Sequence, residues 1–178
     1  MNSPVLSIAQ QTIALLLDDS YLMEQQELFL KWSRGDFSRD HYFQLQEELG
    51  AKISKGVLFD WEQLKKDNPE IYKHEKAHKK VLDNYGVKSQ LYKVSEDCYY
   101  VEDIDLKDIA IEREYSREKV RSIQKEMVSA PFTQDSLLTV LHVPDILQIE
   151  ILNGTIRKIH LDDIVNAFSK YKWSVEKI

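Results

Sequence analysis

His74, Glu75 and His78 form the pattern in this chain that points most directly to chemistry. Residues four apart share one side of a helix, so the two histidines can bind a single zinc ion. A glutamate next to the first histidine can act as general base toward a water molecule on that ion. The spacing therefore predicts a zinc site with His74 and His78 as metal ligands and Glu75 as the catalytic base.

The pattern lies in the best-marked helix of the sequence, expected over residues 69–85. Asn68 suits the N-cap, Pro69 suits the first helical position, and Gly86 suits the position just past the end. At about 100° per residue, the two histidines and the glutamate fall on the apolar side of this helix, while most of its lysines fall on the other. We therefore expect the three residues to face inward.

A structural role for the same residues is the alternative. His74 and His78 would then be core histidines that hydrogen-bond to neighbouring carbonyls or carboxylates. Glu75 would lie at the solvent edge and pair with Lys79 in the favourable i,i+4 orientation. The residues alone leave both interpretations open.

This helix resembles the HExxH helix of the zincin metalloproteases, in which two histidines bind zinc and the glutamate polarises the attacking water. The resemblance is confined to this helix and implies a small zinc-dependent, peptidase-like hydrolase acting on a protein or peptide. The sequence departs from the family at Lys76, Lys79 and Lys80, where uncharged residues are usual. It also has Asn84 where the extended form of the motif has a third histidine.

A catalytic zinc normally has three protein ligands and one open position, so a further ligand is expected from outside the motif. A carboxylate is the expected type, because many follow the motif and only two histidines do. We take Glu112 as the candidate third ligand. The other candidates are Glu114, Glu96, Asp97, Glu102, Asp103 and His142.

We interpret the cysteine and the other histidines mainly as structural residues. Cys98 is the only cysteine, so an internal disulfide and a multi-cysteine zinc site are both excluded. We interpret it as an ordinary strand residue. His41 and His160 are interpreted as structural or surface residues, as is His142 unless it binds the metal.

Composition sets the broad class. The chain has 178 residues, a net charge of −6, and 43% hydrophobic and 30% charged residues, as expected of one folded domain. The acidic balance argues against nucleic-acid binding. The N-terminus lacks the basic region of a signal peptide, and its apolar run is too short to span a bilayer. We expect a cytoplasmic protein without nucleic-acid or membrane partners.

The remaining elements indicate an α+β fold dominated by helices. Helices are expected over 5–17, 21–32, 39–49, 61–66, 116–128 and 164–171, and strands over 90–94 and 99–101. Asn153 and Gly154 predict a hairpin between strands 147–152 and 155–159. The expected single domain thus has a helical layer over residues 1–50. The α+β core, with a small antiparallel sheet and flanking helices, is expected over residues 57–178.

A second function is compatible with the sequence. Trp32, Tyr42, Phe43 and Trp61 lie near one another in the chain and could form an aromatic docking surface. The chain would then be a non-catalytic interaction or regulatory protein, or a zincin-like domain that has lost its activity.

Overall fold

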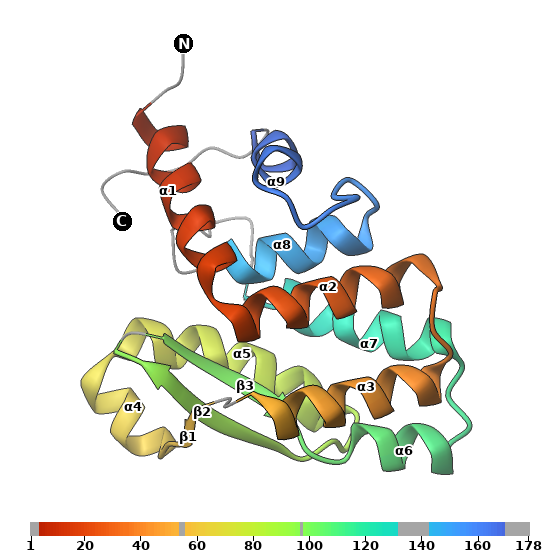
Figure 1. The fold of residues 1–178 in the computed structure, drawn as a ribbon. Helices are drawn as coiled ribbons and strands as arrows, with labels where there is room; N and C mark the ends of the chain where they lie inside the picture. Colours follow the sequence, from red (N-terminus) through yellow and green to blue (C-terminus); the bar gives the residue numbers. More distant parts are fainter. Residues whose placement is uncertain (1–3, 54–55, 97, 132–142, 170–178) are drawn as a thin grey trace. The chain divides into compact units, whose positions relative to one another are not determined.

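The computed structural model describes residues 4–53, 56–96, 98–131 and 143–169. They form the predicted α+β fold, in which helices predominate (Figure 1). The chain divides into two compact units, one made of residues 1–49 and 134–178 and the other of residues 50–133. No helix within the described ranges is long and apolar enough to cross a membrane.

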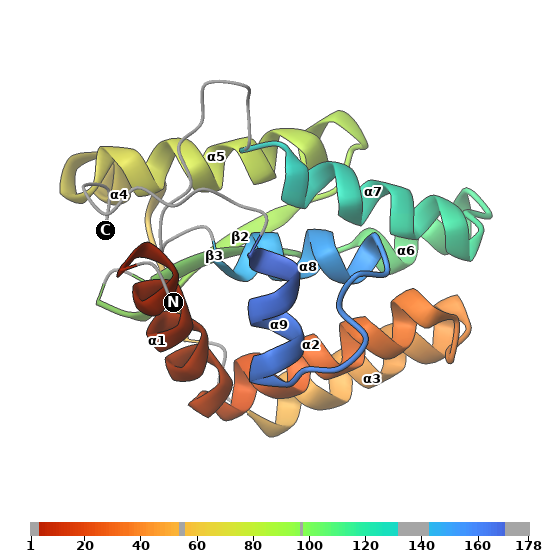
Figure 2. The ribbon, with the colours of Figure 1, turned by 90° about the horizontal axis from the view of Figure 1, so that it is seen from above.

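The first unit contains helices from both ends of the chain. They are α1 (Pro4–Asp18), α2 (Ser20–Arg34), α3 (Arg39–Lys52, as far as Leu49 in this unit), α8 (Val143–Leu152) and α9 (Leu161–Phe168). Helix α1 packs against α2, α8 and α9, and α2 also packs against α8 (Figure 2). The segments that form α8 and α9, which we expected to lie in the α+β core, therefore group with the N-terminal helices.

The three predicted N-terminal helices are confirmed, with small differences at their ends. Asp19 caps α2 by accepting a hydrogen bond from the backbone N–H of Leu22, and Gly35 ends α2 in the left-handed conformation at φ 90°. Helix α3 continues through Gly50 to Lys52, whereas the sequence predicts its end at residue 49.

The hairpin predicted around Asn153 and Gly154 is wrong. Val143–Leu152 form helix α8, and residues 155–159 contain no strand. Gly154 adopts φ 80°, and the N–H groups of Gly154 and Thr155 donate to carbonyls in the last turn of α8. This is the hydrogen-bond pattern of a helix C-terminus closed by glycine. Asn153 and Gly154 therefore end a helix instead of joining two strands.

The second unit contains the sheet and the helix that carries the histidines. Its elements are β1 (Val57–Leu58), α4 (Trp61–Asp67), α5 (Pro69–Asn84), β2 (Ser89–Ser95), β3 (Cys98–Asp103), α6 (Leu106–Glu112) and α7 (Arg117–Ser129). The strands are antiparallel in the order β1-β2-β3. Both predicted strands are confirmed, whereas β1 and α6 were not expected.

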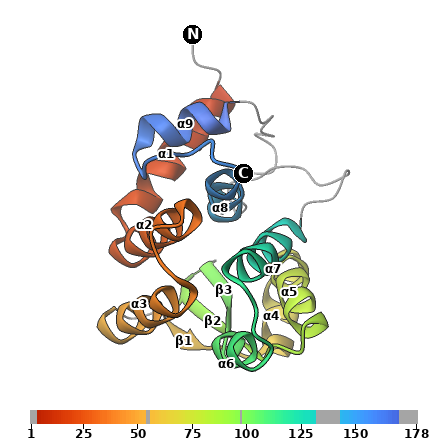
Figure 3. The same ribbon diagram turned by 90° about the vertical axis from the view of Figure 1, so that its right-hand side faces the viewer.

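Helix α5 is held between the sheet and two other helices. It packs against α4, α7 and β3, and α4 and α5 lie on the same side of the sheet (Figure 3). Leu64 of α4, Ile71 of α5 and Leu91 of β2 form a buried cluster, with Val101 of β3 packed against it. One side of α5 is therefore fixed in the core of this unit.

The predicted aromatic docking surface is wrong for three of its four members. Trp32, Tyr42 and Phe43 expose only 0%, 2% and 4% of their surface. Trp32 stacks on Tyr42 with ring centroids 4.4 Å apart, because flat aromatic side chains on adjacent helices bury most area in this way. Trp61 is half-buried in the other unit, where its ring packs edge-on against Tyr72.

Candidate metal centre

Helix α5 begins and ends where the sequence predicts. The Asn68 side chain accepts a hydrogen bond from the backbone N–H of Ile71 at 3.1 Å, and Pro69 occupies the first helical position. Tyr85 is the C-cap, and Gly86 follows it at φ 73°. These local signals set where the helix begins and ends, and burial of its apolar residues sets which side faces inward.

Two of the three motif residues that we expected to face inward are buried. Glu75 exposes 6% of its surface and His78 exposes 5%, while His74 is half-buried beside them. The apolar members of the same face are Ile71, Val81 and Leu82. Figure 2 shows α7 running alongside α5, and α7 is one of the elements that α5 contacts.

Two lysines of α5 have partners away from this face, and the other two, Lys73 and Lys80, are exposed. The ammonium group of Lys76 lies 4.6 Å from the centroid of the Trp61 ring, and Lys79 forms an ion pair with Asp83 at 2.7 Å. Glu75 is buried and is therefore not at the solvent edge, where the structural alternative placed it to pair with Lys79. The charged residues inside and after the motif thus do not crowd the histidines.

The two histidines face each other through their Nε2 atoms. These atoms are 3.3 Å apart, and the ring planes are perpendicular. Two nitrogens bound to a tetrahedral zinc at about 2.0–2.1 Å lie roughly 3.3–3.4 Å from each other. The separation in this structure equals the separation that one zinc ion requires. It is also short enough for a direct hydrogen bond between the two rings, as the structural alternative needs.

The orientation of His78 is fixed by a backbone group of α7. Its Nδ1 lies 2.9 Å from the carbonyl oxygen of Met127. Because a carbonyl only accepts, Nδ1 carries the proton, and in the neutral ring Nε2 then keeps its lone pair. Histidines that bind metals are commonly oriented in this way by a second hydrogen bond. Met127 lies in the last turn of α7, where the helix dipole favours positive charge.

Glu75 completes the group. One ligand atom from each of His74, Glu75 and His78 lies within 4.8 Å of the other two. Among the residues that the structure describes, this is the one group of three or more metal-ligating side chains at such spacing. The group can therefore place two nitrogens and one buried carboxylate around a single small cation.

The structure does not bring Glu112 into this group. Glu112 is exposed at the end of α6. The other described candidates for a third ligand also lie outside the group: Glu96, Glu102, Asp103 and Glu114. Asp97 and His142 lie outside the described residues.

The C-terminal end of α5 is tied to the α6–α7 segment. Arg113 donates a hydrogen bond to the carbonyl oxygen of Tyr85 at 3.0 Å, and the Tyr85 hydroxyl donates to Glu126 at 2.5 Å. The hydrogen bond to Glu126, followed by burial, raises the pKa of Tyr85 above its ordinary value. Helices α5 and α7 are thus joined at two places, here and at the His78–Met127 hydrogen bond.

One member of the site was not found by sequence reasoning. The Met127 carbonyl is a backbone group and has no signal in the residue types. The apolar spacing of 116–128 predicts the inner face of α7 but not that this face meets the histidines.

Comparisons of the chain with protein-family models, with curated proteins and with solved structures found no match.

Proposed function

We propose that this chain is a small zinc-dependent hydrolase with peptidase-like chemistry. His74 and His78 would hold the metal, and Glu75 would be the general base. The observation that carries the proposal is the 3.3 Å separation of the two Nε2 atoms, because it suits a single tetrahedral zinc. The buried carboxylate in the same group adds the base that hydrolysis requires.

Each residue has a distinct part in the proposed chemistry. Met127 holds His78 with its Nε2 lone pair toward His74. Bound zinc would lower the pKa of a water molecule toward neutrality. Glu75 would accept the proton of the attacking water and then donate it to the leaving group. Because Glu75 and His78 are almost fully buried and His74 is half-buried, a substrate would approach from the His74 side.

Zinc binding is the first test. Protein purified without a histidine tag and stripped with a chelator should bind about one zinc per chain. The His74→Ala and His78→Ala variants should lose this zinc, and Glu75→Gln should keep it. His41→Ala is the matched control, because His41 is exposed in the other unit. Metal analysis and the zinc-induced rise in Tm are the measurements.

Hydrolysis is the second test. The zinc-loaded chain should cleave members of a fluorogenic peptide mixture, and Glu75→Gln should abolish cleavage while zinc remains bound. Zinc binding without cleavage of peptides would overturn the peptidase-like chemistry and leave the metal site standing. If the unmodified chain does not bind zinc, both the metal site and the peptidase-like chemistry are overturned. The result would favour a structural role for a hydrogen-bonded pair of histidines.

The alternative of a non-catalytic interaction or regulatory protein has less support. It depended on an aromatic surface, and Trp32, Tyr42 and Phe43 are buried.

A further inference from the structure

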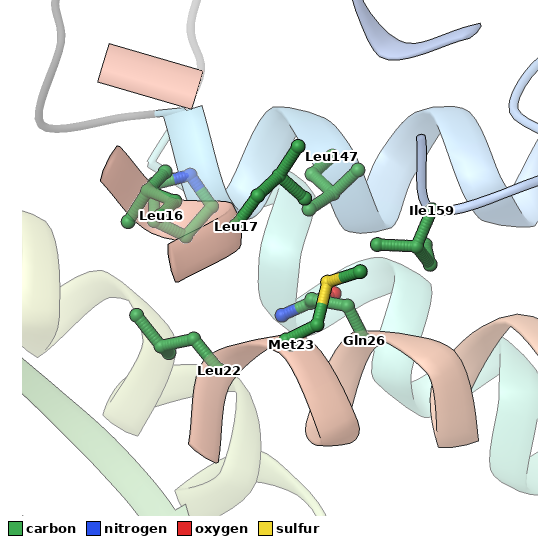
Figure 4. A pocket seen from close by; sticks show the side chains of 8 residues that line it. Leu16, Leu17, Leu22, Met23, Gln26, Leu147 and Ile159 are labelled. Carbon is green, nitrogen blue, oxygen red and sulfur yellow. The ribbon is translucent and has the colours of Figure 1, made fainter. Parts of the chain in front are cut away.

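A small cavity in the first unit is too narrow to hold a ligand. It lies between α1, α2 and α8, and Figure 4 shows Leu17, Met23 and Leu147 among its lining side chains. Its volume is about 10 Å³, which is room for one water molecule. The side chains that could bind a larger partner lie instead on the surface of the second unit.

Four half-buried aromatic side chains pack against the buried cluster of Leu64, Ile71 and Leu91. Two of them come from the start of α4 and the segment before it, one from α5 and one from β3. They are Phe59, Trp61, Tyr72 and Tyr99. Each ring is therefore partly covered by the core of the second unit and partly open.

Two lysines hold their ammonium groups over the rings of α4 and α5. The ammonium group of Lys76 lies 4.6 Å from the centroid of the Trp61 ring and 5.7 Å from that of Tyr72. The ammonium group of Lys65 lies 5.7 Å from the Tyr72 centroid. At such distances the negative face of an aromatic ring attracts a cation. The rings therefore restrict where these two charges can lie.

A third lysine has the same arrangement on the sheet. Lys93 of β2 is paired with Tyr99 of β3, and its ammonium group lies 5.6 Å from the centroid of that ring and 5.4 Å from that of Phe59. We call the three lysines and the four aromatic residues the aromatic–lysine surface. Its members are Phe59, Trp61, Lys65, Tyr72, Lys76, Lys93 and Tyr99.

The three ammonium groups form no ion pair with a carboxylate of the described residues. Lys79, three residues after Lys76 on α5, is by contrast paired with Asp83 at 2.7 Å. Lys73 and Lys80 are exposed and lie three and four residues from Lys76, so they add positive charge on the same side of the helix. The surface therefore offers several positive charges to an anionic partner. Because the rings already restrict the lysine side chains, less rotamer freedom is lost when an anion binds.

The arrangement favours the carboxylates of a peptide over a nucleic acid. Base stacking requires open ring faces, and here ammonium groups lie over the rings. Asp60 and Glu62 flank Trp61 in the sequence and are exposed, and the whole chain has a net charge of −6, so a continuous polyanion would be repelled. We propose that the aromatic–lysine surface is a docking site for an acidic peptide segment of another protein, whose carboxylates pair with these lysines.

The first test uses the unmodified chain. The probe is a peptide of alternating glutamate and leucine residues, and the same peptide with glutamine in place of glutamate is its control. The chain has three tryptophans, of which Trp61 belongs to the surface and Trp32 is fully buried in the other unit. The acidic peptide should shift the indole N–H NMR signal of Trp61 and leave that of Trp32 unchanged. The glutamine peptide should bind about tenfold more weakly or worse, because several exposed ion pairs are lost together.

Substitutions test which lysines are used. Lys76→Gln and Lys93→Gln should each weaken binding of the acidic peptide by about two- to fivefold, as expected for one exposed ion pair. Trp61→Leu should also weaken binding without changing the charge, because Lys76 loses the ring that holds it. Lys79→Gln is the matched control, because it removes the same charge from the same helix but its ammonium group is already paired. It should leave the affinity unchanged.

Three results would overturn the proposal. One is that the acidic peptide does not shift Trp61 at low salt, where exposed charges are least screened. Another is that Lys79→Gln weakens binding as much as Lys76→Gln, which would indicate unspecific attraction between charges. The third is tighter binding of oligothymidylate than of the peptide, which would make a nucleic acid the partner. None of these results depends on zinc, since the surface includes no residue of the candidate metal group.

Discussion

In the proposed site, a proton and a zinc ion would compete for the same space between His74 and His78. The Nδ1 proton of His78 is committed to the Met127 carbonyl, so its Nε2 faces the Nε2 of His74 with a lone pair. Without metal, one proton between the two Nε2 atoms completes a hydrogen bond. If zinc bound here, both nitrogens would be its ligands, and any proton on the Nε2 of His74 would have to leave. The 3.3 Å separation suits either occupant, so the choice between them is chemical rather than steric.

Asp103 is a residue at which stability depends on pH. Burial is the main cause, followed by the charge of Glu102, and together they raise the pKa of Asp103 from 3.8 to about 6. A hydrogen bond from the backbone N–H of Leu106 opposes the shift without cancelling it. Between pH 4 and 6 the folded chain therefore binds a proton that the unfolded chain releases. The contribution of Asp103 to stability is complete below about pH 4 and falls as the pH rises to about 6.

The Asp103→Asn variant should remove this dependence, because the amide resembles the protonated carboxyl and still accepts a hydrogen bond. At pH 7 we expect the variant to be more stable by about 1–2 kcal/mol, and at pH 4 to match the unmodified chain. Urea unfolding at both pH values is the measurement. Asp108→Asn, exposed in the first turn of α6, is the control and should change little. A loss of stability at pH 7 would contradict the prediction.

Capping residues allow a helix to be located from the sequence, because they act on neighbouring backbone groups. Asn68, Pro69 and Gly86 act within one turn of the ends of α5, so the sequence locates this helix and its inward face correctly. The sequence does not reveal the Met127 carbonyl, because that contact joins residues far apart in the chain and involves no side-chain donor or acceptor of α7. The position of Glu112 depends in the same way on how α6 packs.

Helix α8 shows how a local signal can mislead. Residues 147–151 alternate apolar and polar side chains, and Asn153 with Gly154 follows, so the segment resembles a hairpin. A glycine at positive φ serves a helix end equally well. The decisive evidence is the longer pattern of buried residues, which recurs at helical spacing: Val143, Ile146, Leu147, Glu150 and Ile151. The structure selects the helix because this whole face packs against α1, α2 and α9.

Two glycines at positive φ should differ in their tolerance of substitution. Gly154 has φ 80° and no neighbouring atom within 4 Å of an added Cβ, so Gly154→Ala should cost about 1–2 kcal/mol from backbone strain alone. Gly56 has φ 95°, and an added Cβ would lie 2.4 Å from the carbonyl oxygen of Lys93 on β2. Gly56→Ala should therefore cost more, because it also forces β1 away from β2.

Urea unfolding of the two glycine variants is the measurement. Equal losses of stability would show that the β1–β2 pairing adjusts to the added methyl group. Gly154→Asn is a useful third variant, because asparagine tolerates the left-handed conformation and should recover part of the loss.

At the scale of the whole molecule, the candidate metal ligands His74, Glu75 and His78 all belong to the unit of residues 50–133. This unit has its own sheet and its own buried cluster. We therefore expect residues 50–133, produced as a separate chain, to fold and to bind zinc with the stoichiometry of the full chain. Circular dichroism and metal analysis are the measurements, and the same segment with His74→Ala and His78→Ala is the control. A segment that stays unfolded both with and without zinc would contradict the prediction.

The first unit is formed by two segments of the chain, with the second unit inserted between them. The ribosome makes α1 and α2 before the second unit, but it makes α8 and α9, which pack against them, only after that unit. Domains usually complete in the order in which they are synthesised. In this chain the second unit should be complete first. All its helices and strands have been synthesised before α8 and α9, against which α1 and α2 pack, are made. We expect the apolar side chains that α8 later covers to be accessible to chaperones during this interval, so the speed at which α8 and α9 are translated should influence the yield of folded protein.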